Sequence, residues 1–353
     1  MFVKGTDTRS MHAPAPRGPL SGAVLDVLLT DPADTDSDDS LRLLKSAIDE
    51  RPPRDPLTDD DLQLALFVLY EQHYTGMDGA SEEWEWDARL IALRRELEDV
   101  HEQALHEHVS MPTLPKADAA DVAEALFALT APHSGPSLAR VIASEATAEH
   151  MREHLILRSI YTLKEADPHS WAIPRLRGRP KAALVEVQTD EYGGGRPERV
   201  HATMFARAMR GAGLDDRYGF YLDAVPATTL ASMNTMSLFG LHRRWLGAIC
   251  GHLAAFEMTS SLPSRMIASG LRRLDFSDDV VAYFDEHVEA DAVHEQVAAR
   301  DLAGALAEQQ PALVRDIMFG AAACLLVDGL AADETRLAWR QGRSALRETA
   351  VPA

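Results

Sequence analysis

The stretch that decides the fold is DARLIALRRELEDVHEQALHEH, residues 87–108. Its leucines and isoleucine recur at helical spacing, and strong helix formers fill the positions between them. Upstream, residues 57–74 read LTDDDLQLALFVLYEQHY, in which Thr58 is predicted to cap a helix whose first turn is acidic. Both segments therefore predict helices with one apolar face.

Working outward, the same pattern fills most of the chain. Further helical segments are expected at residues 117–131, 136–166, 180–192, 197–213, 235–261, 277–310 and 311–331. Alternation typical of strands is nearly absent, and only AALVEVQT, residues 182–189, fits a short strand. The prediction is an all-α fold of roughly eight to ten helices.

The amino-terminal part looks different from the rest. Residues 1–20 are rich in proline, glycine and polar groups, and DPADTDSDD, residues 31–39, is acidic and turn-like, so residues 1–37 are expected to form a flexible tail. A short helix is predicted over residues 40–50, which the prolines of RPPRDP end. Residues 38–345 are then expected to form one helical domain, with its functional core at about 136–330.

Composition excludes several classes of function. The 353 residues carry a formal net charge of −20, which disfavours nucleic acid and anionic membrane as partners. No run of 18 apolar residues predicts a membrane span, and the first residues lack the apolar core of a secretory signal, so a cytoplasmic location is expected. Cys250 and Cys324 lie in apolar helical segments and are predicted to be buried thiols rather than a disulfide or a zinc site.

The segment YFDEHVEADAVHEQVAARD, residues 283–301, carries the strongest chemical signal. His287, Asp291 and His294 fall within an arc of roughly 60° on one helix face. Two imidazoles and a carboxylate presented together suit iron, manganese or zinc. Because glutamates surround the three residues, a solvated polar helix is the alternative reading.

Carboxylates and a further histidine lie on other predicted helices. Glu191 and His201 flank the triple glycine 193–195, a break that allows both side chains to point inward, although a plain turn with a solvated Glu191 fits equally well. Glu257 ends an apolar helix, where a carboxylate needs a cation or an ion pair. Glu165, in LKEADPHSWAIPRL, offers a fourth carboxylate.

The sequence lacks the motifs of several other classes of enzyme. The histidines of HEQALH, residues 101–106, are five apart and not four, so they do not form the zinc-protease motif. The triple glycine lacks the form of a phosphate-binding loop, and neither GxSxG nor CxxC occurs. Four carboxylates and three histidines on separate helices of a bundle are instead the ligand chemistry of a carboxylate-bridged di-iron site.

These motifs, in order, resemble the iron-containing redox enzymes of the haem-oxygenase-like di-iron oxidase superfamily over about residues 136–300. The resemblance rests on KEADPHSWAIPRL at 164–176, DEYGGGRPERVHATMF at 190–205, Glu257 and the HxxxDxxH pattern at 287–294. It implies a seven-helix haem-oxygenase-like bundle without haem, to which additional amino-terminal helices are joined. It also implies two iron ions, dioxygen as co-substrate and an external electron donor.

The resemblance also implies roles for individual residues. Glu191 would bridge the two irons, and His201 and His294 would bind one of them. The other iron would be held by Glu257, His287 and Asp291, and Glu165 matches a carboxylate that only some members use. Members carry out N-oxygenation, desaturation or decarboxylation of fatty acids, and carbon–carbon cleavage, so a small-molecule substrate is expected but its identity is not fixed.

Two functions of other classes remain open. The chain is alternatively a helical protein that binds iron or haem without turnover, or a structural domain with a charged helix face. The amino-terminal helices would extend the bundle or serve a homodimer.

Overall fold

A computed structural model describes residues 11–132 and 135–348, and it confirms the all-α fold. No strand occurs in either of these ranges; the nearest feature is an isolated bridge between Met11 and Met77. The amino-terminal half contains α1 (Pro19–Leu28), α2 (Ser37–Asp49), α3 (Asp60–Glu71), α4 (Ala88–His108), α5 (Ala119–Leu129), α6 (Leu138–Ser144) and α7 (Ala148–Thr162).

The second half contains the remaining helices of the bundle. They are α8 (Asp167–Ser170), α9 (Gly178–Glu191), α10 (His201–Gly211), α11 (Ala227–Leu241), α12 (Leu246–Met258), α13 (Ser261–Arg273), α14 (Asp278–Gln296), α15 (Ala305–Gln309) and α16 (Val314–Arg340). A π-helical segment, η8 (Val297–Gly304), joins α14 to α15, and two 3-10 turns, η4 (Gly193–Gly195) and η5 (Pro197–Arg199), join α9 to α10.

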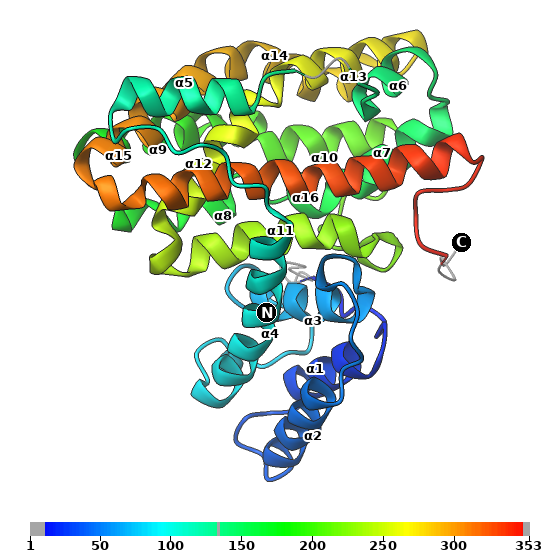
Figure 1. Ribbon diagram of the computed structural model, residues 1–353. Coiled ribbons are helices and arrows are strands. Elements are labelled where there is room, and N and C mark those ends of the chain that lie inside the picture. Colours follow the sequence, from blue (N-terminus) through cyan, green and yellow to red (C-terminus); the bar gives the residue numbers. More distant parts are fainter. Residues whose placement is uncertain (1–10, 133–134, 349–353) are drawn as a thin grey trace, which may run out of the picture.

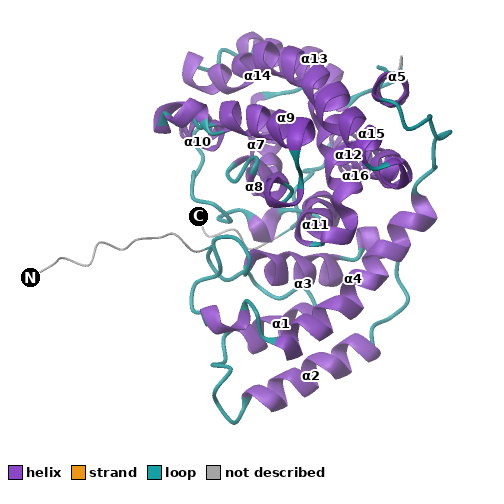
Figure 2. Cartoon of the chain, turned by 90° about the vertical axis from the view of Figure 1, so that its left-hand side faces the viewer, coloured by secondary structure: helices purple, strands orange, loops and turns teal. Residues whose placement is uncertain are grey.

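The helices form two parts that meet at α11 (Figures 1 and 2). Helices α1 to α4 lie on one side of it, and α3 packs against α11. On the other side α12 and α16 run side by side through the bundle, and α13 and α14 pack against each other beyond them. Glycines allow the closest approach: a Cβ atom at Gly251 would collide with the carbonyl of Ile317, and one at Gly320 with that of Ala248.

The structure corrects two expectations about local structure. Within the expected tail, residues 19–28 form α1, because PLSGAVLDVL carries apolar side chains that pack in the core, and Met11 is buried as well. Helix α2 begins at Ser37 rather than at residue 40. Residues 182–189, which also fit a short strand, lie within α9, in agreement with the helix predicted at residues 180–192.

The cap of α3 also differs from the expectation. Its N-cap is Asp59, whose side chain accepts hydrogen bonds from the amides of Asp61 and Leu62, and Thr58 ends a preceding 3-10 turn. A carboxylate at this position interacts with the helix dipole as well as with the amides, which favours Asp59 over the neighbouring threonine. Residues 1–10, part of the expected tail, lie outside the described residues.

Two further sequence expectations can be compared with the structure. Cys250 and Cys324 are both buried free thiols, as expected, and burial raises the pKa of Cys250 to about 12. Within the described part of the chain, every helix is too short or too polar to cross a membrane.

Candidate metal centre

Glu165 lies in the turn that follows α7, and its neighbours hold that turn in place. Ala166 adopts a left-handed conformation with φ 77°, and its carbonyl accepts a hydrogen bond of 2.9 Å from the buried Gln188 side chain. Lys164 forms a buried ion pair of 2.6 Å with Glu71 of α3. The turn is therefore held from α9 and from the amino-terminal helices, which fixes the direction of Glu165.

Glu191 and His201 are brought together by the triple glycine. Glu191 is the last residue of α9, and His201 is the first of α10. Gly193 has φ 68°, and a Cβ atom there would lie 2.6 Å from the amide nitrogen of Val200, so only glycine lets the chain return so closely. This tight return places His201 Nδ1 2.8 Å from Glu191 Oε2, which confirms that the break aims both side chains inward.

The remaining candidates come from α12 and α14. Glu257 lies near the end of α12, and His287 and His294 lie two turns apart on α14. All three side chains are buried. The backbone of Asp291 lies between the two histidines in α14, but its side chain lies outside the described residues, so its expected role remains a prediction.

These side chains form two groups that share one carboxylate. In each group, the ligand atoms lie within 4.8 Å of one another. The first group contains Glu165, Glu191, His201 and His287, and the second contains Glu191, Glu257 and His294. We refer to the two groups together as the carboxylate–histidine cluster.

Glu191 directs one oxygen to each group. Its Oε2 lies 2.8 Å from His201 Nδ1, and its Oε1 lies 4.0 Å from His294 Nδ1. In the first group His287 Nε2 lies 3.7 Å from Glu165 Oε2, and in the second His294 Nδ1 lies 3.3 Å from Glu257 Oε2. A carboxylate placed in this way has the geometry expected of a bridge between two cations.

The pairing of the histidines differs from the one that the family resemblance implies. His201 groups with His287 and not with His294, which lies with Glu257 instead. The reason is the packing of α10 against α14, which places the His201 and His287 rings 4.4 Å apart between centroids. Glu165 belongs to the first group, together with Glu191, His201 and His287.

Hydrogen bonds outside the cluster orient its histidines. His287 Nδ1 lies 2.8 Å from the carbonyl of Tyr283, which turns Nε2 toward the first group. His294 Nε2 lies 3.0 Å from Asp190 Oδ2, which turns Nδ1 toward the second. The hydroxyl of Tyr283 donates to Glu165, at 2.9 and 2.7 Å from its two oxygens. Such partners fix the tautomer and the direction of metal-binding side chains.

The sequence analysis did not single out Asp190 and Tyr283, although spacing offered a signal. Asp190 directly precedes Glu191, and Tyr283 precedes His287 by four residues, one turn along the same helix face. Two histidines with buried rings, His169 and His252, also lie beside the cluster with 3.2 Å between Nε2 and Nδ1.

The electrostatics of the cluster reflect mutual neutralisation. Burial lowers the pKa of His294, but Glu257 and Asp190 outweigh it and raise the pKa to about 9. Burial also lowers the pKa of His201, but the neighbouring Glu191 outweighs this effect, so the net pKa is raised. Burial raises the pKa of Glu165, but the neighbouring His287 outweighs it, and the net pKa is lowered. The carboxylates and imidazoles thus neutralise one another, and a divalent cation can take the place of the imidazole protons.

The donor atoms fit a metal ion better than they fit one another. Among the described residues, Glu191 Oε2 and His201 Nδ1 are buried without a hydrogen-bond partner, although they lie only 2.8 Å apart. Leaving buried polar atoms in this state is costly unless a further group satisfies them. Nitrogen and carboxylate ligands suit iron, so the residues fit the metal that the sequence predicts.

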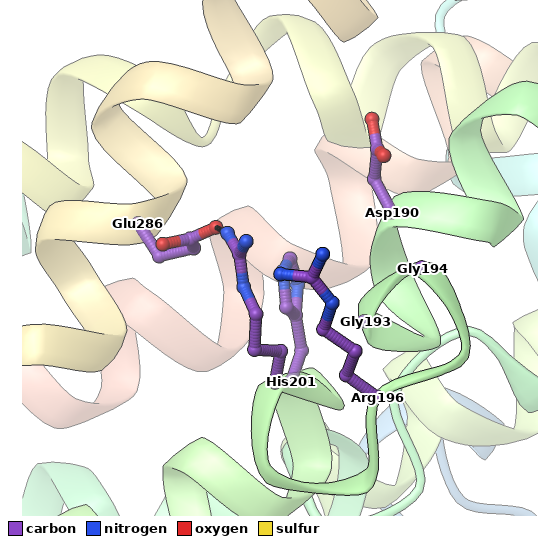
Figure 3. A pocket seen from close by; sticks show the side chains of 7 residues that line it. Asp190, Gly193, Gly194, Arg196, His201 and Glu286 are labelled. Carbon is purple, nitrogen blue, oxygen red and sulfur yellow. Dashed lines mark hydrogen bonds and ion pairs between the residues drawn. The ribbon is translucent and has the colours of Figure 1, made fainter.

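A pocket of about 410 Å³ leads from the surface to His201. Figure 3 shows Asp190 and Glu286 on opposite sides of this pocket, with Arg196 and His201 between them. Arg199 also lines it and forms an ion pair of 3.0 Å with Glu286. The cluster is therefore buried but lies directly beneath a polar opening.

Comparison with known proteins adds one finding. A family model described as iron-containing redox enzyme matches residues 152–329, from α7 to α16. That range contains every residue of the carboxylate–histidine cluster, whereas α1 to α6 lie outside it. No curated protein matches the chain.

Proposed function

Because the chain belongs to the family of iron-containing redox enzymes, we propose that its carboxylate–histidine cluster holds two iron ions with which it uses dioxygen to oxidise a small molecule. The observation that carries the proposal is Glu191, which directs one oxygen to each of two ligand groups. Di-iron carboxylate proteins build the same arrangement inside helical bundles: two groups of metal ligands that share a carboxylate.

The proposed ligands follow from the geometry. Glu165, His201 and His287 would hold one iron. Glu257 and His294 would hold the other, and the helix spacing predicts that Asp291 is a further ligand of this second iron. When bound, iron in this setting supplies redox chemistry with dioxygen, which the protein's own side chains lack. An external electron donor is part of the proposal, and the reaction is N-oxygenation, desaturation or oxidative carbon–carbon cleavage.

The protein's own residues have three tasks under this proposal. Tyr283 and Asp190 hold Glu165 and His294 in the direction that metal binding requires. The buried helices around the cluster exclude bulk water, which protects reactive species from side reactions. His201 and His294 must lose their protons when iron binds, because a protonated nitrogen cannot be a ligand.

Anaerobic reconstitution with Fe(II), followed by metal quantification and by oxygen-uptake measurements, tests the proposal. We expect about two irons per chain and oxygen-dependent oxidation of the bound iron. Glu191→Gln should lose both irons, whereas Glu186→Gln, an exposed change on the same helix, should retain them. Wild-type protein that takes up no iron in stoichiometric amount would contradict the proposal.

A further inference from the structure

The turn that carries Glu165 is joined to the amino-terminal helices by a buried ion pair. Lys164 Nζ lies 2.6 Å from Glu71 Oε2, and the two side chains are 4% and 0% exposed. Lys164 belongs to the turn after α7, whereas Glu71 is the last residue of α3, which packs against α11 (Figure 1). The pair therefore links the two parts of the molecule, and one end of it lies directly beside a proposed metal ligand.

Both partners of this ion pair are held by further contacts. The hydroxyls of Thr75 and Tyr218 donate hydrogen bonds of 2.8 and 2.9 Å to the two oxygens of Glu71. The Lys164 ammonium lies over the rings of Tyr74 and Tyr218, 4.1 and 5.1 Å from their centroids. A cation in such a place is attracted by the aromatic faces as well as by the carboxylate. The Lys164 side chain is therefore held in one direction.

Glu165 lies between two anchored neighbours. On its amino-terminal side, the side chain of Lys164 is held by Glu71. On its carboxy-terminal side, the carbonyl of Ala166 accepts a hydrogen bond of 2.9 Å from Gln188 of α9. Because each residue of a chain has only two soft backbone dihedrals, a rotation that moves Lys164 also moves the Glu165 carboxylate. The direction of this metal ligand is thus coupled to α3.

Stability alone gives little reason to retain such an ion pair. Removing two charges from water costs about as much as their attraction returns, and apolar side chains of similar volume often stabilise a core equally well. What the pair adds is geometry, because a charged hydrogen bond requires one distance and one direction. The geometry that it fixes here is that of the turn bearing Glu165.

We propose that Glu71 is a positioning residue of the metal centre, which acts through Lys164 to hold Glu165 in the direction that the first iron requires. The inference rests on the proposed function, because it gives the amino-terminal helices a part in the same iron centre. Glu71 lies outside residues 152–329, so the match to the family does not include this role. The alternative is a purely structural ion pair, which joins the amino-terminal helices to the bundle without affecting iron.

Chelator competition on full-length Glu71→Gln, with Fe(II) under anaerobic conditions, tests the inference. The substitution keeps the volume of the side chain and removes the charge that holds Lys164. We expect a loss of about tenfold or more in iron affinity at the first group, as for other outer partners of metal ligands. The second group, to which Glu257 and His294 belong, should bind iron as in the wild type.

Gln63→Leu is the matched control, because it disturbs the same helix without removing a partner of Lys164. From α3, the Gln63 side chain lies 3.1 Å from His101 Nδ1 and 2.7 Å from Asn234 Nδ2. Its replacement should lower the stability of the fold but leave both iron affinities unchanged. An equal loss of iron affinity in both variants, or no loss in Glu71→Gln, would overturn the inference and leave a structural ion pair.

A measurement on the wild type keeps the inference testable if Glu71→Gln does not fold. By linkage, a contact that strengthens iron binding is itself strengthened when iron binds, by the same factor. Hydrogen exchange at residues 67–76, around Glu71, should therefore slow by about tenfold when Fe(II) is added. Exchange in α2, which the ion pair does not include, should stay unchanged. An equal response in both segments, or none in either, would overturn the inference.

The two proposals fail in different ways. Wild-type protein that binds two irons, with Glu71→Gln binding them equally tightly, would overturn the positioning role and leave the proposed function intact. Wild-type protein that takes up no iron would overturn the proposed function, and the positioning role with it.

Discussion

Two buried polar clusters in this protein differ in how their atoms are satisfied. In the first, Gln63 of α3, His101 of α4, and Asn234 and Thr235 of α11 form a network that we call the hydrogen-bonded cluster. Both ring nitrogens of His101 lie within 3.1 Å of a partner, the Gln63 amide and the Thr235 hydroxyl. Gln63 also accepts a hydrogen bond of 2.7 Å from Asn234.

The carboxylate–histidine cluster has the opposite character. Its nitrogen and oxygen atoms converge, but Glu191 Oε2 and His201 Nδ1 make no hydrogen bond to any residue that the structure describes. Its hydrogen bonds run outward, to Tyr283 and Asp190. In the hydrogen-bonded cluster the side chains mostly satisfy one another and Asn234 Oδ1 alone lacks a partner among the described residues, whereas groups buried to bind a ligand leave several inner atoms available. The comparison predicts that the two clusters respond differently to mutation.

The largest expected effect is on iron binding. His201→Ala should remove the iron of the first group and His294→Ala that of the second, each with more than about a 100-fold loss of affinity at the affected site, because even outer partners contribute 10- to 100-fold. Metal analysis should then find one iron per chain in each variant. His108→Ala, at the exposed end of α4, is the control. If both irons persist in either variant, the assignment of groups is wrong.

Removing a member of the hydrogen-bonded cluster should affect stability instead. Gln63→Leu leaves His101 Nδ1 without its partner in a buried site and removes one of the two acceptors of Asn234 Nδ2, at a cost of about 3 kcal/mol in the free energy of unfolding. Urea unfolding measures the loss, and iron content should be unchanged. Thr130→Val, which removes a half-buried hydroxyl directly after α5, provides a milder comparison. A loss of iron in Gln63→Leu would show that the two clusters are coupled.

The histidines of the two clusters should give opposite pH dependence. Burial lowers the pKa of His101 to about 4, below its unfolded value near 6.5, so its contribution to stability is lost as the pH falls. Between pH 7 and pH 5 this amounts to about 2 kcal/mol. The pKa of His294 is raised to about 9 despite burial, so the stability it contributes to the metal-free protein is present below pH 6.5 and lost as the pH rises through 9.

Urea unfolding of metal-free protein from pH 5 to pH 9.5 checks both signs. His101→Gln should remove part of the acid-side loss, and His294→Gln should remove part of the alkaline-side loss. Each variant should leave the slope on the other side as in the wild type. Unchanged slopes in both would mean that neither imidazole controls the pH dependence.

The sequence was sufficient for the helical class but not for every element. Helical spacing predicted α4, α9 and α14, because one face of each is apolar or carries the functional groups. It did not predict α1, since a short apolar run after several prolines has too few residues to show a period. Its burial depends on contacts with α2 and α3 that no local pattern records.

The candidate site could be predicted as a set of residues but not as an arrangement. Side-chain type, helix spacing and family resemblance together identified Glu191, His201 and His294. Which histidine shares a group with which carboxylate depends on how α10 packs on α14, and for that reason the grouping in the structure differs from the pairing that the resemblance implies.

The smallest expected effect concerns the hydrogen bonds by which the carboxylate–histidine cluster is supported from outside. Tyr283 donates its hydroxyl to Glu165, and its carbonyl lies 2.8 Å from His287 Nδ1. Tyr283→Phe removes only the hydroxyl and keeps both the ring and the carbonyl, so the direction of His287 is preserved while Glu165 gains freedom. Because outer partners of metal ligands contribute about 10- to 100-fold to affinity, we expect a loss of about tenfold in iron affinity at the first group.

Competition with a chelator of known affinity measures that change, and the second group should be unaffected because His294 is held by Asp190 instead. Tyr221→Phe, a tyrosine remote from the cluster whose hydroxyl accepts a hydrogen bond from the amide of Asp215, is the matched control. If Tyr283→Phe binds iron as tightly as the wild type, Glu165 is already fixed by its strained turn at Ala166 and by Lys164. In that case the backbone of the turn, rather than side-chain hydrogen bonds, would orient Glu165.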